Sequence, residues 1–213
     1  MGVEIKWLGH SCFRMADGSL AVYTDPYNLA AAVNDGDVIC ISHAHYDHCS
    51  PDDIARIAKP DATIVCTEDV VSQVGNFLKN IVVISPGRTV NVGSLKIEGV
   101  AAYNIGKKFH PQDSGWCGYV LNIGGRRIYY AGDSDRIPEM KNLKNIDLAI
   151  LPVGGTYTMT PQEAAAAVDD IGCVEAIPCH WGSVIGSEAD AKNFISLIKC
   201  EGILLKFGQS TKI

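Results

Sequence analysis

The order of β-rich and helical segments repeats along the chain, and this repetition is the strongest constraint on its fold. Short apolar runs separated by Gly, Pro, Asn or Asp come first and helical segments follow, and the same order returns in the second half. Two such halves predict a fold of the α/β (α+β) class. We expect a four-layer αββα sandwich in which two mixed sheets pack together, helices cover the outer faces, and the halves are related by a pseudo-twofold.

A length of 213 residues allows a substantial core within one domain, so we expect residues 1–213 to form a single domain. Gly124 and Gly125 suit a two-residue turn between two neighbouring strands. The expected strands cover residues 3–8, 12–15, 20–24, 37–42, 63–67, 81–85, 94–103, 118–123, 127–132, 147–153 and 174–179.

Helices are expected where cap residues precede apolar side chains at helical spacing. Ser50 is the expected N-cap of the first helix, with Pro51 at its first position. Thr160 and Glu163 form a capping-box pattern at the start of the third helix, and Gly172 ends it. The four expected helices cover residues 50–58, 67–78, 160–172 and 187–201.

Charge and cysteine usage exclude several classes of partner. The 24 Asp and Glu residues outnumber the 18 Lys and Arg residues, so we predict no nucleic-acid or membrane partner, because both require clustered basic side chains. No stretch approaches the roughly 18 apolar residues that span a bilayer, and the first residues lack the pattern of a signal peptide. The eight cysteines are scattered without a CxxC pair. They are expected to be small buried apolar side chains in a reducing compartment, which predicts a cytoplasmic location.

The decapeptide ISHAHYDHCS, residues 41–50, contains three of the six histidines and follows an apolar run that is expected to end a buried strand. Asp133 and His180 also come directly after apolar runs. Because ligands gather outside the carboxyl ends of strands in open α/β sheets, we expect these side chains to converge on one cleft. The converging groups are His43, His45, Asp47, His48, Asp133 and His180.

Imidazole and carboxylate groups are the ligands of zinc and related divalent ions. Six such groups are too many for one tetrahedral ion, but they fit two ions about 3.5 to 4 Å apart that share a carboxylate and a hydroxide. The sequence therefore predicts two divalent metal ions, with Zn²⁺ as the first choice and Mn²⁺ or Fe²⁺ as alternatives.

The motif His43-Ala-His45-Tyr-Asp47-His48, together with Gly132-Asp133 and His180, resembles the metallo-β-lactamase fold superfamily of metal-dependent hydrolases. The segments WLGHSCF, TDPY, AGDSD, LPVGGTYTM and IPCHWG are similar to its small single-domain branch, which includes ascorbate-6-phosphate lactonase-like enzymes. The similarity covers nearly the whole chain. It implies an αββα sandwich, and it implies metal ligands at the motif residues named above.

One position departs from the pattern of this superfamily. Many members carry a histidine directly after the strand equivalent to residues 94–103, where this chain has Asn104. Either His110 returns to the cluster as the missing ligand, or the first metal site, which contains His43 and His45, lacks one ligand. We favour His110, because only His10 and His110 are otherwise unassigned and His110 lies in a polar, glycine-bounded loop.

Several residues are candidates for supporting roles. By resemblance, Asp25 is expected behind the histidine-rich loop, where it would fix the tautomer of a histidine; a turn-forming role is the alternative. His10 is expected either to line the floor of the cleft or to form a hydrogen bond within a turn. Tyr157, Thr158 and Trp181 are candidates for substrate contact.

Two lysines near His110 have two alternative interpretations. Lys107 and Lys108 either attract an anionic group of the substrate or belong to a solvated surface, and the solvated surface is favoured. The expected partner is a small-molecule substrate, for which an anionic group is one alternative, and the sequence specifies no oligomeric state.

The leading functional hypothesis is a hydrolase in which a metal-bound hydroxide attacks a lactone, an ester or a phosphoester. Asp133 is expected to bridge the two ions, and Asp47 is expected to be a ligand and a catalytic residue that orients the nucleophile. Two alternatives stay open. The first is a diiron-type oxidoreductase, although such enzymes on this fold usually have glutamate at the position of His45. The second is a metal-binding protein without catalysis, which is favoured only if the first metal site is incomplete.

Overall fold

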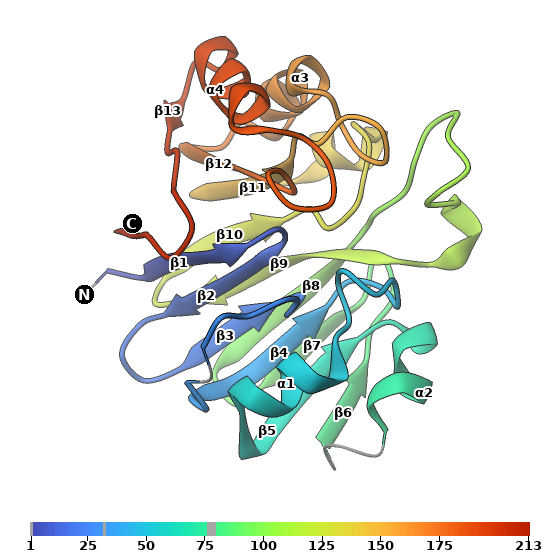
Figure 1. Cartoon of the computed structure of the whole chain (residues 1–213), viewed down its shortest axis with the longest axis vertical. Coiled ribbons are helices and arrows are strands. Elements are labelled where there is room, and N and C mark those ends of the chain that lie inside the picture. The colour runs from blue at the N-terminus through green and yellow to red at the C-terminus, as the bar shows by residue number, and fades with distance from the viewer. Residues whose placement is uncertain (1, 32, 76–79) are drawn as a thin grey trace.

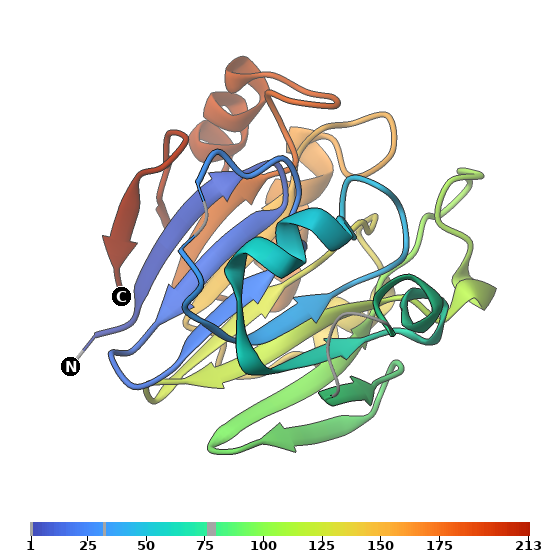
Figure 2. The same ribbon diagram turned by 60° about the horizontal axis from the view of Figure 1, so that its bottom comes forward.

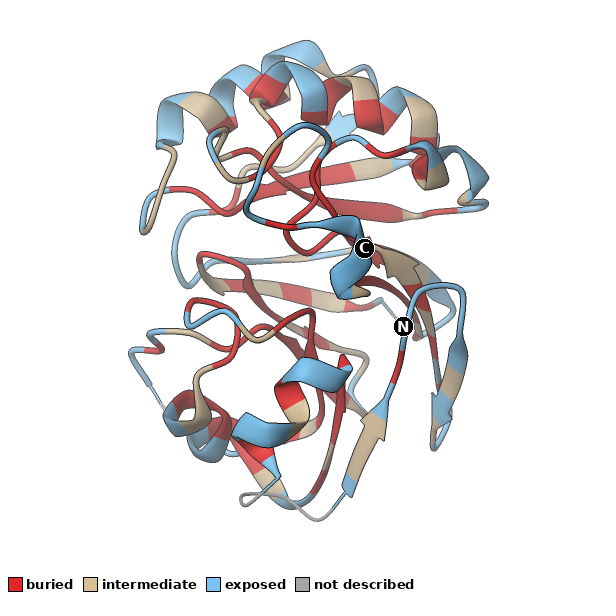
Figure 3. Ribbon diagram, turned by 90° about the vertical axis from the view of Figure 1, so that its right-hand side faces the viewer, coloured by how far each residue is buried: buried red, intermediate tan, exposed pale blue. Residues whose placement is uncertain are grey.

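Two seven-stranded sheets pack face to face, and helices cover their outer faces (Figures 1 and 3). The computed structural model describes residues 2–31, 33–75 and 80–213. Figure 3 shows buried positions concentrated between the layers and exposed positions on the outer helices. The predicted four-layer sandwich is confirmed.

The two sheets contain strands from both ends of the chain. The first sheet has the order β14 (Ser210–Lys212), β1 (Glu4–Gly9), β2 (Cys12–Ala16), β3 (Ala21–Thr24), β4 (Gly36–Ile41), β5 (Ala58–Cys66) and β6 (Asn80–Val83). The second has the order β13 (Glu201–Gly202), β12 (Glu175–Cys179), β11 (Leu148–Pro152), β10 (Arg126–Tyr130), β9 (Cys117–Ile123), β8 (Leu95–Ala101) and β7 (Thr89–Val92).

The same sequence of pairings occurs in both sheets. From β14 to β6, three antiparallel pairs are followed by three parallel pairs. From β7 to β13, the pairs again run three antiparallel and then three parallel. This equivalence is the expected pseudo-twofold, and it makes β3 the counterpart of β10 and β5 the counterpart of β12.

The helices follow the same division between the halves. Those of the first half lie outside the first sheet, and those of the second half lie outside the second sheet (Figure 1). They are α1 (Pro51–Ile57), α2 (Val71–Val74), α3 (Pro161–Ile171) and α4 (Glu188–Leu197). Short 3₁₀ turns cover Glu68–Val70, Gln112–Ser114 and Pro138–Asn142.

The predicted caps and hairpin turn are confirmed. The Ser50 side chain accepts a hydrogen bond from the Asp53 amide at the start of α1. Thr160 and Glu163 form both bonds of a capping box at α3, and Gly172 ends that helix in the left-handed conformation. Gly124 and Gly125, at φ of 55° and 78°, form the turn between β9 and β10.

Two helices and four strands differ from expectation, and one of these strands is β5, which begins at Ala58 instead of residue 63. The predicted helix at 67–78 becomes a 3₁₀ turn followed by the four-residue α2, and its last three residues lie outside the described ones. The helix expected at 187–201 ends at Leu197, because Ile198 is extended and the following Glu201–Gly202 pairs with β12. The short strands β7, β13 and β14 were not predicted, since pairing with a neighbour defines them more than their own residues do.

Strand β4 shows how the layers share a core. Val38 and Cys40 pack between the two sheets, whereas Ile39 and Ile41 pack on the opposite face under α1. Alternate side chains of a strand point to opposite faces, so an uninterrupted apolar run is needed where both faces are covered. The histidine-rich loop therefore begins at the end of a strand that is packed on both faces and is held rigidly.

The cysteines fit the sequence-based expectation of small buried side chains. All eight cysteines are free, and all but Cys200 are buried. Within the described ranges, no helix is both long and apolar enough to cross a membrane.

We expect Thr160→Ala to lower the free energy of unfolding by about 1 kcal/mol, because it removes the hydroxyl that accepts the Glu163 amide at the helix cap and leaves only the bond from the backbone amide of residue 160. The Thr160 hydroxyl accepts from the Glu163 amide at 3.3 Å, and Glu163 Oε2 accepts from the Thr160 amide at 2.7 Å. Urea denaturation measures the change. Thr156→Ala, at an exposed loop position, is the matched control, and an equal loss in that variant would contradict the role of the cap.

Candidate metal centre

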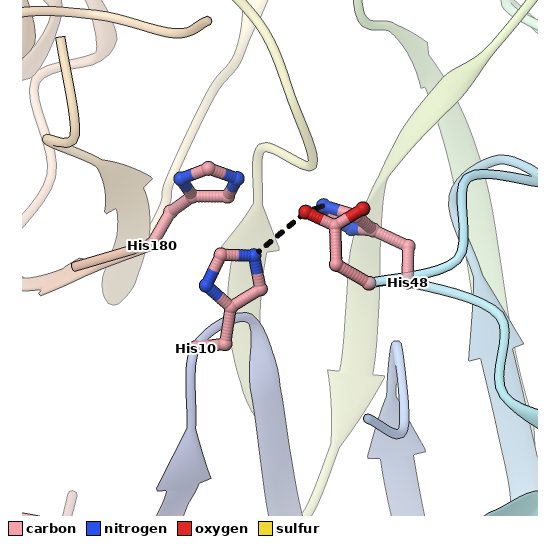
Figure 4. A group of neighbouring side chains, drawn as sticks. His10, His48 and His180 are labelled. Atoms are coloured by element: carbon pink, nitrogen blue, oxygen red, sulfur yellow. Dashed lines mark hydrogen bonds and ion pairs between the residues drawn. The ribbon is translucent and has the colours of Figure 1, made fainter. Parts of the chain in front are cut away.

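Side chains from several strand ends meet at one edge of the sandwich. The histidine-rich loop follows β4, Asp133 follows β10 and His180 follows β12, while His110 belongs to the long connection between β8 and β9. His10 reaches the same place from the turn between β1 and β2. Figure 4 shows His10, His48 and His180 directed toward one another from three separate segments. The predicted convergence of these residues is present in the structure.

Three residues at this edge adopt a backbone conformation that is costly for residues other than glycine. The φ angles of His10, Asp25 and His180 are 47°, 36° and 58°. The His180 amide donates to the His10 carbonyl at 3.0 Å, so two of these strained positions support each other. Strain of this kind is retained where the surrounding structure fixes a side chain for function.

Most of the potential ligand atoms form two adjacent groups, which a third group of His43, His48 and Asp133 connects. The first contains His43, His45 and His110, and the second contains His10, Asp47, His48 and His180; within each group the atoms lie within 4.8 Å of one another. In the first group, His43 Nε2 lies 3.0 Å from His45 Nδ1. In the second, His10 Nε2 lies 3.2 Å from Asp47 Oδ2.

The buried carboxylate of Asp133 lies between the two groups. Its Oδ2 is 3.3 Å from Nε2 of His110 in the first group and 3.2 Å from Nε2 of His180 in the second. Its Oδ1 is 3.3 Å from His48 Nε2. A single carboxylate thus contacts imidazoles of both groups.

These atoms have the spacing of metal ligands, and several of them lack a hydrogen-bond partner. Two donors each about 2.0–2.1 Å from a tetrahedral ion lie roughly 3.3–3.4 Å apart, close to the separations found here. Among the described residues, the buried atoms His48 Nε2, His110 Nε2, His180 Nε2 and Asp133 Oδ1 have no hydrogen-bond partner. Leaving one such atom unsatisfied costs about 1–3 kcal/mol. The donor set therefore fits divalent cations.

Asp25 and Ser42 orient two of the histidines. His48 Nδ1 donates to Asp25 Oδ2 at 2.7 Å, which leaves Nε2 free to face Asp133. His43 Nδ1 donates to Ser42 Oγ at 2.8 Å, and that hydroxyl donates in turn to Asp25 at 2.6 Å. Such contacts fix the tautomer and ring orientation of metal-binding histidines. Asp25 lies where the sequence places it, whereas Ser42 was not singled out.

The electrostatics favour a cation at this point. Burial raises the pKa of the Asp133 carboxyl, but His180 and His48 hold that pKa well below its ordinary value. Burial lowers the pKa of His48, yet Asp133 and Asp25 hold it well above its ordinary value. Burial and the neighbouring His48 hold the pKa of His43 well below its usual range, so its imidazole is neutral. A divalent ion bound here would supply positive charge next to the carboxylates of Asp25 and Asp133.

A tryptophan that the sequence did not mark covers the first group. The Trp116 ring lies with its centroid 4.7 Å from that of His43, 4.9 Å from that of His45 and 5.5 Å from that of His110. Its indole N–H donates to Asp69 Oδ2 at 2.8 Å, and the same oxygen accepts from the Ala44 amide at 3.0 Å. Trp116 and Asp69 therefore fix the loop that carries the first two histidines.

Asn104 holds His110 instead of competing with it. Asn104 Oδ1 accepts from the His110 amide at 3.2 Å and from His110 Nδ1 at 3.0 Å, which leaves His110 Nε2 toward Asp133. The Asn104 amide donates to Asp135 and to the carbonyl of Tyr157. Both ends of this side chain are thus used, and its position suits an orienting role.

The two lysines near His110 do not face the site as free charges. Lys107 donates to Asp135 Oδ1 at 2.6 Å and to the Thr158 carbonyl at 2.7 Å, so it connects two loops. Lys108 is exposed. The Thr158 side chain is fully buried, which removes it from the candidates for substrate contact.

A cavity of about 230 Å³, the metal pocket, opens over the cluster. Tyr157 lines it, as the sequence suggested, whereas Trp181 and His10 line a separate cavity. Tyr46 and Phe109 form its outer walls with 65% and 44% of their surfaces exposed. The lining consists of His45, Tyr46, Asp47, Phe109, His110, Asp133, Tyr157 and Val184.

Comparison with known proteins identifies the family. Residues 4–180 match the family model for the beta-lactamase superfamily domain. A protein of Thermococcus onnurineus named UPF0173 metal-dependent hydrolase is 35% identical, over 97% of this chain and 98% of its own length. The chain belongs to the metallo-β-lactamase superfamily. It is a metal-dependent hydrolase, so the alternative of a metal-binding protein without catalysis is not supported.

Solved structures of this superfamily have the same fold. A crystal structure of a protein from Parabacteroides distasonis, described as a metal-dependent hydrolase, matches with a TM-score of 0.86 at 31% identity, covering 97% of this chain and 94% of that one. The metallo hydrolase Igni18 of Ignicoccus hospitalis matches with a TM-score of 0.80 at 20% identity, covering 100% of this chain and 99% of that one. The second likeness concerns the fold alone. The narrower resemblance to ascorbate-6-phosphate lactonase-like enzymes stays a prediction.

We expect His110→Ala to weaken metal binding at the first group by more than about 100-fold, and Asn104→Ala by about 10- to 100-fold. Loss of a direct ligand should exceed loss of the residue that orients it. Metal titration followed by inductively coupled plasma mass spectrometry measures both. Gln112→Ala, exposed in the same loop, is the control. A greater loss in Asn104→Ala than in His110→Ala would make Asn104 the ligand.

Proposed function

We propose that the protein is a hydrolase with two divalent metal ions, of which zinc best matches the donor set. His43, His45 and His110 hold the first ion, Asp47, His48 and His180 hold the second, and Asp133 is shared. When bound, the ions activate water near neutral pH and stabilise negative charge that develops on the attacked group. The position of Asp133 between the two groups, with its distances of 3.2 to 3.3 Å to both, carries this proposal.

Asp47 is the proposed catalytic residue among these groups. It lines the metal pocket, and its carboxylate accepts a hydrogen bond from His10 Nε2 at 3.2 Å. That contact holds one oxygen in place, so the carboxylate orients a water molecule in the pocket and accepts its proton. His10 acts here as a positioning residue, since its ring lies behind Asp47 in the neighbouring cavity.

The lining of the metal pocket favours an uncharged substrate. Among the described residues, its lining includes no Lys or Arg, and Lys107 is bonded elsewhere. The lining offers no basic side chain to contact the charged oxygens of a phosphoester, so only the two ions would offset their charge beside Asp47 and Asp133. Tyr46, Phe109 and Tyr157 offer apolar contact instead. We therefore propose a neutral ester or lactone with an apolar substituent as the substrate class.

We expect Asp133→Ala to lose most of both metal ions, because one carboxylate serves both sites. Elemental analysis of the purified variant gives the metal content per chain, with Asp113→Ala as a control at an exposed carboxylate outside the cluster. Full metal content in Asp133→Ala would end the proposal of a shared ligand, and loss of one ion only would assign Asp133 to a single site.

We expect the metal-loaded protein to hydrolyse neutral lactones or esters with a kcat/KM at least about tenfold above that for phosphodiesters with the same leaving group. Asp47→Ala should slow the reaction by about 100-fold or more, the usual contribution of a general base. Steady-state kinetics on one matched panel measures both effects.

The melting temperature and metal content of Asp47→Ala separate catalysis from folding and from metal loss. Asp52→Ala, an exposed carboxylate of the same segment, is the matched control. Faster turnover of the phosphodiesters would overturn the assignment of a neutral substrate. Activity within a few-fold of the unaltered protein would remove Asp47 from the mechanism.

A further inference from the structure

A second cavity, of about 420 Å³, adjoins the metal pocket at His10. Four aromatic side chains form its walls, namely Trp7, Tyr27, Trp181 and Phe207, and we call it the aromatic compartment. These residues come from β1, from the loop after β3, from the loop after β12 and from the segment before β14. Segments far apart in sequence thus contribute one type of side chain to one cavity.

The tryptophans of this compartment are rigidly held. Trp7 and Trp181 are only 4% and 8% exposed, and their ring centroids lie 4.6 Å apart. Trp7 Nε1 donates to the His10 carbonyl at 3.0 Å, and Trp181 Nε1 donates to the Pro178 carbonyl at 3.2 Å. Both indole N–H groups are therefore used within the protein, and the rings present carbon surface to the cavity.

The charged side chains of the compartment lie at its rim. Glu188 and Lys206 line the cavity and are both exposed, and Glu188 pairs with Lys192 at 2.9 Å. The walls are mainly aromatic, and His10, Asn28 and Ser183 add polar side chains to them. Aromatic contacts are therefore the largest part of what the compartment offers to a ligand.

The aromatic compartment and the metal pocket share their dividing walls. One wall is the contact between His10, which lines the compartment, and Asp47, which lines the pocket. Another is the edge-to-face pair of Tyr27 and Tyr46, with ring centroids 5.8 Å apart. The segment 181–184 borders the compartment with its first three residues and the pocket with Val184. Tyr46 is 65% exposed, so this boundary reaches the protein surface, where one molecule can extend across it from the metal pocket to the compartment.

We propose that the aromatic compartment binds an aromatic ring of the substrate while its ester or lactone group lies in the metal pocket. This inference rests on the proposed function, and it adds an aromatic substituent to the proposed ester or lactone substrate. Aromatic rings interact edge-to-face or offset-stacked at centroid distances of about 4.5–7 Å, and these contacts contribute beyond the burial of area. A saturated ring of similar size lacks that contribution, which makes it a matched probe.

Binding is tested without turnover, using benzyl alcohol and cyclohexylmethanol as probes in ligand-observed NMR titrations of the metal-free and the metal-loaded protein. Benzyl alcohol is expected to bind about two- to tenfold more tightly than cyclohexylmethanol, the range that aromatic pairs provide. Phe207→Ala should weaken the binding of benzyl alcohol by a similar factor. Phe207 is 61% exposed, so its removal costs little packing.

Phe109→Ala, in the wall of the metal pocket, tests the other position of the ring, and it should weaken the binding of benzyl alcohol less than Phe207→Ala does. Loss of binding in Phe109→Ala but not in Phe207→Ala would place the ring in the metal pocket and overturn the proposal. Equal binding of the two alcohols would overturn it as well.

Kinetics on γ-lactones with a phenyl, cyclohexyl or methyl substituent completes the test. The ratio of kcat/KM for the phenyl lactone to that for the methyl lactone should fall about two- to tenfold in Phe207→Ala. If the lactones are hydrolysed and the ratio does not change, the compartment does not bind the substituent. If no lactone or ester is hydrolysed while benzyl alcohol binding depends on Phe207, the proposed function fails and the aromatic site stands.

Discussion

The buried carboxylate of Asp25 connects the parts on which the site depends. It is fully buried and accepts four hydrogen bonds, from the Ser42 amide, the Ser42 hydroxyl, His48 Nδ1 and the Tyr130 hydroxyl. A buried carboxylate is tolerated only when its oxygens are satisfied in this way. Tyr130 belongs to β10 of the second sheet, and the other donors belong to the loop that follows β4 of the first. One side chain thus links the two sheets and fixes the tautomer of His48.

Asp25 and Asp133 follow equivalent strands of the two halves, yet their surroundings differ. Asp25 after β3 is surrounded by protein donors that complete its hydrogen bonding. Asp133 after β10 faces imidazole nitrogens that lack partners. The pseudo-twofold thus places two carboxylates at equivalent strand ends, and the neighbouring donors decide which one supports the structure and which one is available to a ligand.

The sequence predicted the layers, the caps and the residues that converge on the cluster, because these depend on local patterns. Cap residues act within one helical turn, and ligand-type residues after apolar runs mark strand ends. Trp116, Asp69 and Ser42 could not be found in this way, since their contacts join segments that only the packed fold brings together. Ile198 shows the same limit for secondary structure, because helical residues precede it and only the pairing of Glu201 with β12 explains why α4 ends there.

The pairing of β1 with β14 has a consequence for the order of events during synthesis. Ile5 lies opposite Thr211, so this edge of the first sheet has no partner strand until about 200 further residues have been translated. Phe207 arrives with the same segment. An edge strand without its partner is prone to pair with other chains. The nascent protein therefore exposes the edge of β1 until the segment with Phe207 and β14 has been translated, and this edge is where a chaperone would have most to protect.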